Sequence, residues 1–334
     1  MTTRTIARVC YALHLHKLAY ALNRDRKRVI TFHNVLDDDI FEQNTANGVS
    51  CSFSGFKRII EEVSKVFKFS LDLDDPTTAT ITFDDGYNNQ VEIAAPYLIS
   101  KGITAYLFVS GQLIDQNTNN SSNGALIVDK LLHWVSFVPE GEYTINIDGV
   151  KLKIEVDANR NKLWTESIWP LFLADTEHKG EIVMSALNEA YPISRIFEGL
   201  DQKYIRQRLS GVTTQQLSDL KNNGWQIGWH TQSHYPVALL KQKDKETELT
   251  PCDACDSTVF SYPYGGMADA DAESYHILRK KGCTKVVSNI NYGNHKVGDW
   301  YRSRQSLPDD PIMLHFELSG LKYFLKYRKL LPKI

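Results

Sequence analysis

Short apolar runs alternate with longer amphipathic stretches along most of this chain. The runs are rich in β-branched and aromatic residues, and the stretches between them carry apolar residues at helical spacing. Strands that alternate with helices in this way are typical of βαβ units and a mostly parallel sheet, so the pattern predicts an α/β fold. The predicted strands are 28–35, 79–86, 103–110, 225–230, 258–265 and 284–289, and the predicted helices are 53–67, 90–101, 213–224 and 270–282.

The rhythm changes between residues 112 and 205. Residues 142–156 alternate polar and apolar positions on either side of Asp148-Gly149, a dipeptide that strongly favours a two-residue hairpin turn. Helical stretches follow the hairpin, and the parallel rhythm resumes at about residue 213. We therefore interpret 112–205 as an inserted α+β segment rather than a second catalytic domain.

Size and composition fit one large domain. The chain has 334 residues, which is long for one domain but within the range of α/β barrels that carry insertions. Hydrophobic residues make up 42% of the chain, enough to fill a sizeable core. Because the formal net charge is only -2, there is no basic field that would indicate nucleic acid as a partner.

Both ends of the chain are amphipathic and basic. Residues 1–27 have apolar positions at helical spacing and end in a basic cluster, and residues 321–333 show a similar pattern. Such segments could lie on an anionic membrane surface or pack as helices on the outside of a barrel. Because no apolar run is long enough to span a membrane and no stretch has the features of a secretory signal, we expect a cytoplasmic protein that could contact the inner face of the membrane.

The five cysteines are scattered along the chain and do not form the pattern of a disulfide framework, which favours a reducing compartment. Cys252 and Cys255 form a C-x-x-C pair, but a structural zinc site would need a second pair of ligands at suitable spacing. We find no such pair nearby, so two thiols in a surface loop are the preferred interpretation.

Two polar clusters follow predicted strands. Asp84 and Asp85 come directly after one strand, and His230 and His234 stand at the end of another. Because the C-terminal ends of parallel strands meet at one mouth of a barrel, we expect the two clusters to converge. Adjacent buried carboxylates are costly unless they bind a cation or hydrogen-bond donors, so the convergence indicates a metal site.

The residue types fit a catalytic metal. The spacing of His230 and His234 would place both imidazoles on one side of a helical turn, and Asp85 would complete a set of three ligands. Three protein ligands leave a position for water, and Asp84 would then be available as a general base. Each cluster alone also fits a solvated turn or unrelated histidines, but their joint occurrence favours a metal.

The segments ITFDDGY (81–87), GWHTQSH (228–234) and FSYPYG (260–265) resemble motifs of the polysaccharide deacetylase family, carbohydrate esterases that share the NodB homology domain. The resemblance covers about residues 28–316, apart from the insertion. It implies a distorted (β/α)7, TIM-like barrel, which we assign to 28–334, with 1–27 as a separate helical segment.

The same resemblance implies roles for individual residues. Asp84 would be the catalytic base, while Asp85, His230 and His234 would hold a divalent metal, most often zinc. The backbone N–H of Tyr264, which follows a proline, would help to bind the oxyanion of the tetrahedral intermediate.

The chain departs from the family pattern in its third motif. Many members carry an arginine two residues before the proline of that motif, where it orients the base, but this chain has Ser261. Arg302 and Arg304, just beyond the last predicted strands, are candidates to fill this role, although both could simply be surface residues.

The catalytic acid is less clear from the sequence. The family supplies a histidine after an apolar strand, and His315 after residues 311–314 fits this description, although it could be structural. His33, in a segment similar to the YHxV of some bacterial members, could line the pocket or pack in the core. Asp299-Trp300 only loosely resembles the fourth motif, and we do not assign it.

These features predict an enzyme that removes the N-acetyl group from an N-acetylated sugar or glycan precursor, in surface polysaccharide biosynthesis. Two alternatives stay open: a non-catalytic glycan-binding protein on the same scaffold, and a hydrolase of another non-peptide C–N bond. The presence of both Asp84 and Asp85 argues against a pure binding protein, which needs no base. The sequence indicates neither the sugar nor an oligomeric state.

Overall fold

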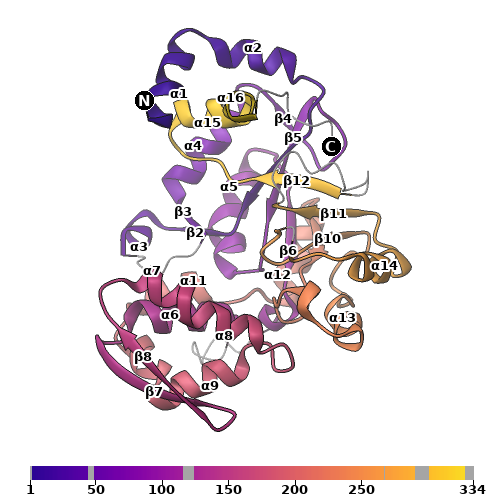
Figure 1. Cartoon of the computed structure of the whole chain (residues 1–334). Coiled ribbons are helices and arrows are strands. Elements are labelled where there is room, and N and C mark those ends of the chain that lie inside the picture. Colours follow the sequence, from indigo (N-terminus) through magenta and orange to yellow (C-terminus); the bar gives the residue numbers. More distant parts are fainter. Residues whose placement is uncertain (1, 44–48, 116–123, 267, 290–300, 328–334) are drawn as a thin grey trace.

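A computed structural model of the chain describes residues 2–43, 49–115, 124–266, 268–289 and 301–327. Seven parallel strands form a closed barrel, because β1 pairs with β12 on one side and with β5 on the other (Figure 1). The predicted (β/α)7 barrel is therefore confirmed. In their order around the barrel, the strands are β1 (Arg28–Phe32), β12 (Tyr301–Gln305), β11 (Lys285–Ser288), β10 (Val259–Ser261), β9 (Gln226–Trp229), β6 (Tyr106–Val109) and β5 (Thr78–Phe83).

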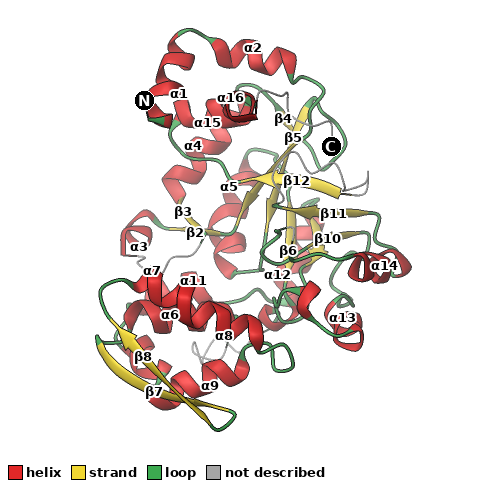
Figure 2. Ribbon diagram, viewed as in Figure 1, coloured by secondary structure: helices red, strands yellow, loops and turns green. Residues whose placement is uncertain are grey.

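Helices and short segments connect the strands and cover the outside of the barrel (Figure 2). The first part of the chain contains α1 (Thr3–Ala12), α2 (Leu15–Leu22), β2 (Asn34–Leu36), α3 (Asp38–Gln43), β3 (Ser50–Ser52), α4 (Phe53–Ser64), β4 (Lys68–Phe69), a π-helical turn (Gln90–Ala94), α5 (Ala95–Ser100) and a 3-10 turn (Gly111–Leu113). The later part contains α12 (Thr214–Asn222), a 3-10 turn (Val237–Leu239), α13 (Gln242–Glu248), α14 (Ala272–Lys280), α15 (Pro311–Leu318) and α16 (Leu321–Tyr327). In the described part of the chain, no helix combines the length and apolar character that crossing a membrane requires.

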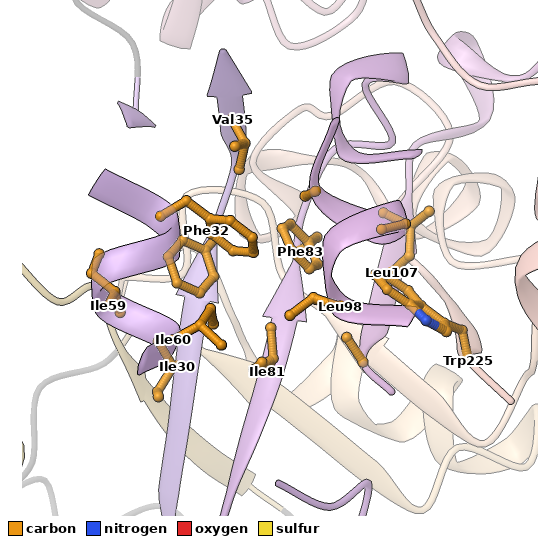
Figure 3. Packing of buried hydrophobic residues seen from close by; sticks show 14 of the residues in the cluster. Ile30, Phe32, Val35, Ile59, Ile60, Ile81, Phe83, Leu98, Leu107 and Trp225 are labelled. Carbon is orange, nitrogen blue, oxygen red and sulfur yellow. The ribbon is translucent and has the colours of Figure 1, made fainter. Parts of the chain in front are cut away.

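The main hydrophobic core lies between the barrel wall and helices α4 and α5 (Figure 3). Phe32 of β1 and Phe83 of β5 stack with ring centroids 5.6 Å apart, and Phe56 of α4 packs edge-on against Phe32. Because successive residues of a strand face opposite sides, the neighbours of these side chains point into the barrel. A separate cluster from several strands, including Val29, Phe108 and Val287, is consistent with that filled interior.

The segment between β6 and β9 forms a compact layer at one end of the barrel (Figure 1). Asp148 and Gly149 have φ angles of 50° and 83°, as a type I′ turn requires, so the predicted hairpin is confirmed. Its core includes the buried Trp134 and Leu187 and continues into Leu36, Ile40, Tyr235 and Leu240 of the segments that connect the barrel strands. The layer consists of α6 (Ile127–Phe137), β7 (Gly141–Ile147), β8 (Val150–Val156), α7 (Arg160–Lys162), a π-helical turn (Leu163–Ile168), α8 (Trp169–Ala174), α9 (Glu181–Ala190), α10 (Ile193–Glu198) and α11 (Gln202–Leu209).

Two predictions for the C-terminal part are wrong. Arg302 and Arg304 were expected beyond the last core strand but lie on β12, a barrel strand whose sequence, YRSRQ, has no apolar run. Residues 311–314 were expected as a strand but form the start of α15. Asp310 caps this helix by accepting a hydrogen bond from the Met313 N–H, and Pro311 occupies its first turn, which are both signals of a helix start.

Candidate metal and catalytic site

The two acidic residues after β5 are buried where the strand ends. Asp84 is 1% exposed and Asp85 is 6% exposed. The chain turns sharply here, since Asp85 and Gly86 have φ angles of 80° and 91°. A Cβ on Gly86 would lie 2.5 Å from a methyl group of Val109, so the turn requires glycine.

The two histidines follow β9 in a loop that is not helical, so the predicted helical turn is wrong. Thr231 and His234 both have left-handed backbones, with φ angles of 70° and 58°. The buried carboxylate of Glu248 accepts hydrogen bonds from the N–H and the hydroxyl of Ser233, at 2.8 and 2.7 Å. This carboxylate holds the loop in the shape that directs His234 back toward the barrel.

Ser110, which follows β6, links the two clusters. Its N–H donates to the carbonyl oxygen of Asp85 at 2.9 Å, and its hydroxyl donates to the carbonyl oxygen of His230 at 3.1 Å. Because β6 lies between β5 and β9 in the barrel, one residue fixes both loops relative to each other.

Asp85, His230 and His234 converge as predicted, and their candidate ligand atoms lie within 4.8 Å of one another. Asp85 Oδ1 is 3.4 Å from His230 Nε2 and 3.2 Å from His234 Nε2, and this buried oxygen has no hydrogen-bond partner. His230 Nδ1 donates to the carbonyl oxygen of Ser261 at 2.6 Å, which leaves Nε2 as the ligand atom. Two imidazoles and one carboxylate are a donor set that fits zinc.

Two imidazoles also dominate the ionisation of Asp85. Burial alone would raise the pKa of this carboxyl, but the adjacent His230 and His234 imidazoles outweigh burial and hold the pKa well below its usual value. Asp85 is therefore ionised, as a metal ligand must be.

Asp84 has a different partner. Arg304 Nη1 donates to Asp84 Oδ1 at 2.6 Å, and Arg304 Nη2 donates to Oδ2 at 2.5 Å and to Ser261 Oγ at 3.0 Å. Burial alone would raise the pKa of Asp84, but the Arg304 guanidinium, with a further contribution from His230, holds it below its usual value. Of the two candidates for the place of the missing arginine, Arg304 is therefore the one that contacts Asp84, and Ser261 helps to hold it there.

Arg302 does not contribute to the site. Its Nε donates to Asp74 Oδ1 at 2.7 Å, and Asp74 lies in the segment that precedes β5. Because the carboxylates at the site follow β5, Arg302 is directed toward the opposite end of the barrel.

His33 lies beside Asp84. It follows β1, lines the same cavity as Asp85, and places Nε2 at 3.7 Å from Asp84 Oδ2. The Gln90 amide donates to the His33 carbonyl oxygen at 2.7 Å and so fixes the backbone. Burial lowers the pKa of His33, although Asp85 and Asp84 partly offset this effect. Of the two hypotheses for this residue, the pocket-lining one is confirmed.

Tyr264 follows β10 and also lines the cavity. Its φ of 60° is left-handed, and its ring packs against His234 with centroids 4.8 Å apart. Among the residues that the structure describes, none accepts a hydrogen bond from its backbone N–H. The N–H is therefore available to a ligand, as the predicted oxyanion role requires.

The cavity at the site has a volume of about 410 Å³ and is shared between the barrel and the inserted layer. The barrel and its loops contribute His33, Asn34, Val49, Asp85, His234, Tyr264, Asn289 and Ser306. The inserted layer contributes apolar, aromatic and charged side chains: Leu126, Val128, Asp129, Leu132, Trp164, Trp169 and Arg208. Sequence patterns did not single out these residues, because nothing local in the sequence shows which face of an inserted helix covers the barrel.

His315 is not brought to the site, which corrects its prediction as the catalytic acid. It lies on α15, where Nδ1 is 2.9 Å from the Tyr20 hydroxyl and Nε2 is 3.3 Å from Glu62 Oε2. Helix α4 starts just after β3, beyond the end of β1, and runs back along the barrel, so Glu62 near its end lies toward the start of the strands. His315 therefore lies away from the mouth that holds Asp85 and His234.

Two other predictions concern loops. Asp299-Trp300 lies outside the described residues. Cys252 and Cys255 are partly exposed in the loop before β10, and their Sγ atoms are 3.5 Å apart. Within the described residues neither cysteine belongs to a group of three metal-binding side chains.

No family model matches the sequence, and no curated protein matches it. Solved structures are similar to it at low sequence identity. The deacetylase PplD from Streptococcus pyogenes, in complex with acetate, is 13% identical, and the alignment covers 85% of this chain and 93% of that one with a TM-score of 0.49. IcaB from Ammonifex degensii is 13% identical over 87% and 96% of the two chains, with a TM-score of 0.48. A de-N-acetylase from Aggregatibacter actinomycetemcomitans is 12% identical over 85% and 95%, with a TM-score of 0.43.

Proposed function

We propose that this chain is a metal-dependent hydrolase of the polysaccharide deacetylase family that removes the acetyl group from an N-acetylated sugar or glycan precursor. The observation that carries the proposal is a buried Asp85–His230–His234 group beside a second buried carboxylate, Asp84, that a guanidinium keeps ionised. A structural metal site has no need of such a base. A role in surface polysaccharide biosynthesis is part of the proposal and rests on the motif resemblance alone.

The metal ligands and the base divide the chemistry between them. Bound to Asp85, His230 and His234, a divalent ion such as zinc would polarise the acetamide carbonyl and acidify a water molecule. Asp84 accepts the proton of the attacking water. Its two oxygens stay ionised and oriented because each accepts a hydrogen bond from Arg304.

The oxyanion and the leaving amine need further groups. The Tyr264 N–H donates to the oxygen that becomes negatively charged when water adds to the acetyl carbon. His33 lines the cavity, and burial lowers its pKa, so its ring is neutral at rest. Its Nε2, 3.7 Å from Asp84 Oδ2, is placed to take up the proton that Asp84 has just accepted from water, and His33 then gives this proton to the amine nitrogen. We therefore propose His33 as the acid.

The alternative of a glycan-binding protein that has lost catalysis receives less support from the structure than from the sequence. Ser261, in place of the family arginine, and the loose match to the fourth motif slightly favour this alternative. Arg304 now supplies a guanidinium to Asp84 from β12, and Ser261 accepts a hydrogen bond from it. A pure binding protein would have no use for this arrangement.

The proposal is tested by metal analysis and by acetate release from N-acetylglucosamine oligomers, lipid-linked N-acetylated sugars and nucleotide sugars. We expect bound metal and acetate release from one of these classes. Asp84→Asn should retain the metal and lose activity by roughly 10² to 10⁴-fold, whereas His230→Ala should lose both. Metal-loaded protein that binds a glycan but releases no acetate would support the binding alternative. Opening of the ring of a cyclic imide would support a hydrolase of another C–N bond.

A further inference from the structure

A buried ion pair from the inserted layer lies in the wall of the catalytic cavity. Asp129 on α6 and Arg208 on α11 line the cavity together with Asp85 and His234. Arg208 Nη2 donates to Asp129 Oδ1 at 2.7 Å, and the two side chains are 2% and 7% exposed. The pair is therefore part of the site and not a surface salt bridge.

Arg208 carries hydrogen-bonding capacity that the described protein does not use. Its Nε and Nη1 are buried and have no hydrogen-bond partner. Leaving such donors unpaired costs about 1–3 kcal/mol each, so buried polar groups of this kind normally meet an acceptor. The guanidinium is held in place from two sides, because it also lies over the ring of Tyr87 at 5.3 Å.

The backbone at Asp129 is linked to α11 through His133. Its carbonyl oxygen accepts a hydrogen bond from His133 Nδ1 at 2.6 Å, and His133 Nε2 accepts one from the Tyr204 hydroxyl at 2.8 Å. The pair of Asp129 and Arg208 is therefore preorganised before a ligand arrives, as a recognition site requires.

The rest of this wall is apolar. Trp164 and Trp169 line the cavity with their rings 5.5 Å apart, and Trp169 also packs against Tyr264. A sugar ring combines apolar C–H faces with hydroxyl groups at its edge. The indole rings of this cavity match the apolar faces of a sugar, and the pair of Asp129 and Arg208 matches its hydroxyl groups.

We propose that Arg208 and Asp129 bind hydroxyl or ring oxygens of a neutral sugar unit that carries the acetamide, so that the inserted layer selects the substrate. Because Asp129 already neutralises Arg208, the unpaired N–H groups call for a neutral acceptor rather than a phosphate or carboxylate. This inference rests on the proposed deacetylase function and names the substrate class for it.

The test compares Arg208→Lys with Arg206→Lys, an exposed arginine on the same helix. Acetate release is measured from N-acetylglucosamine oligomers and from an aryl acetate, which has no sugar ring. Lysine keeps the charge for Asp129 but loses the guanidinium fork. We expect Arg208→Lys to raise the KM for the oligomer by about tenfold or more, and to lose at least tenfold more kcat/KM on the oligomer than on the aryl acetate. Arg206→Lys should change neither the KM for the oligomer nor the kcat/KM on either substrate.

Other results would overturn the inference. Equal losses on both substrates would mean that Arg208 only supports the fold. Asp129→Asn keeps the shape of the pair, and equal losses on both substrates in this variant would lead to the same conclusion. If Arg208→Lys lowers acetate release only from an N-acetylated uronic acid or sugar phosphate, the pair recognises a negative charge and not a neutral sugar. If the unmodified protein releases acetate from the aryl ester but from no sugar, the proposed function itself fails.

A second inference comes from the opposite end of the molecule. Seven of the thirteen large hydrophobic side chains that are exposed in the described chain belong to α1, α2, their connection and α16. Their undersides are packed, because Ala7, Cys10 and Ala19 form a cluster with residues of α15 and α16. We call the outward face the terminal-helix surface: Val9, Leu13, Leu15, Leu18, Leu22, Phe324 and Tyr327.

The helices that carry this surface are basic. Helices α1, α2 and α16 contain Arg4, Arg8, Lys17, Lys322 and Lys326 and no acidic residue. Arg4 and Lys322 pair with Asp310 and Glu317 beside them, so the basic excess comes from the other three. Exposed leucines with a basic surround are typical of helices that lie in the interface of an anionic membrane. The surface lies at the other end of the barrel from the inserted layer, so docking there would leave the catalytic cavity open (Figure 1).

We infer that the terminal-helix surface docks on an anionic lipid membrane. The test is flotation with vesicles of phosphatidylcholine alone and of equal parts phosphatidylcholine and phosphatidylglycerol. We expect binding to the anionic vesicles, weaker binding at high salt, and a loss of about tenfold or more in the double variant Leu18→Ser/Leu22→Ser. The control is Val150→Ser, which removes an exposed valine of the β7–β8 hairpin.

Absence of binding to the anionic vesicles, or binding that the double variant does not weaken, would overturn this inference. A concentration-dependent dimer in sedimentation equilibrium that the double variant dissociates would assign the surface to a second copy of the chain instead.

Discussion

Four residues at the site hold a backbone conformation that side chains other than glycine rarely adopt. Asp85, Thr231, His234 and Tyr264 all have φ angles between 58° and 80°. Such conformations cost on the order of 1–3 kcal/mol each and persist only where surrounding contacts impose them. The hydrogen bonds of Ser110 and Glu248 supply part of that restraint. The fold therefore accepts a local cost in stability at the residues that surround the cavity.

Replacing His33 tests the proposed acid. We expect His33→Asn to retain the metal and to lower kcat for the N-acetylated sugar by roughly 100-fold, because the amine leaves only when it is protonated. An aryl acetate serves as the comparison substrate, since its phenolate leaves without a proton and should be affected much less. Equal losses on the amide and the ester would contradict the acid role.

Arg304 is a positioning residue whose loss should change the pH dependence. In Arg304→Lys one of the two bonds to Asp84 is lost, so the carboxylate is less stabilised and its pKa rises. A base with a raised pKa is ionised only at higher pH, so the acidic limb of the kcat/KM profile should move to higher pH by about one unit. The matched control is Arg302→Lys on the same strand, whose profile should not move. An unchanged profile in Arg304→Lys would contradict the role.

For single residues, the sequence predicts only those features that lie within one short segment of the chain. Asp84, Asp85, His230 and His234 could be identified because each pair lies in one short motif directly after a strand. Arg304 could only be suggested as one of two candidates, because its contact with Asp84 joins residues 220 positions apart. His315 was misplaced because a helix was taken for a strand, and Asp129 and Arg208 carry no local signal at all.

At the scale of elements, a buried histidine joins two helices of the inserted layer. His133 on α6 donates through Nδ1 to the carbonyl oxygen of Asp129 and accepts through Nε2 from Tyr204 on α11, which is the neutral form of the ring. Burial, with a further contribution from Arg208, lowers the pKa of His133 to about 3. The bridge between α6 and α11 is therefore complete only while this ring is neutral.

The stability of the protein should consequently fall in mild acid. Between about pH 3 and pH 6.5 the unfolded chain binds a proton at His133 that the folded protein does not, so the free energy of unfolding decreases as the pH falls through this range. The slope from this residue is about 1.4 kcal/mol per pH unit at most. Urea unfolding between pH 4 and pH 7 measures it, and His133→Gln should show a shallower slope. Equal slopes would show that His133 does not set the acid sensitivity.

The sequence predicts a helix or strand correctly where the residues that determine it lie within that element. The helix predicted at 213–224 is α12, and its Thr213 and Gln216 form the expected capping box. β12 was missed because a strand that lines a polar site need not be apolar. Its arginines are stabilised by carboxylates from other strands and loops, which a single-sequence pattern does not show.

At the scale of the whole molecule, a metal ion would join loops from different parts of the barrel. Asp85 follows β5, whereas His230 and His234 follow β9. An ion held by all three favours the folded state, by about 4 kcal/mol at a thousandfold excess over its dissociation constant. We expect a chelator to lower the Tm and zinc to restore it. His230→Ala should not respond to either treatment, and an equal response in that variant would place the ion elsewhere.

Because Arg304 pairs with Asp84 through two hydrogen bonds, the site is complete only after β12 has been synthesised. A ribosome makes the three metal ligands and Asp84 well before it reaches β12, and β12 is the strand that closes the barrel against β1. Until β12 has been made, Asp84 therefore lacks the guanidinium that orients it. Under the proposed function, we expect a chain that stops before β12 to turn over no substrate.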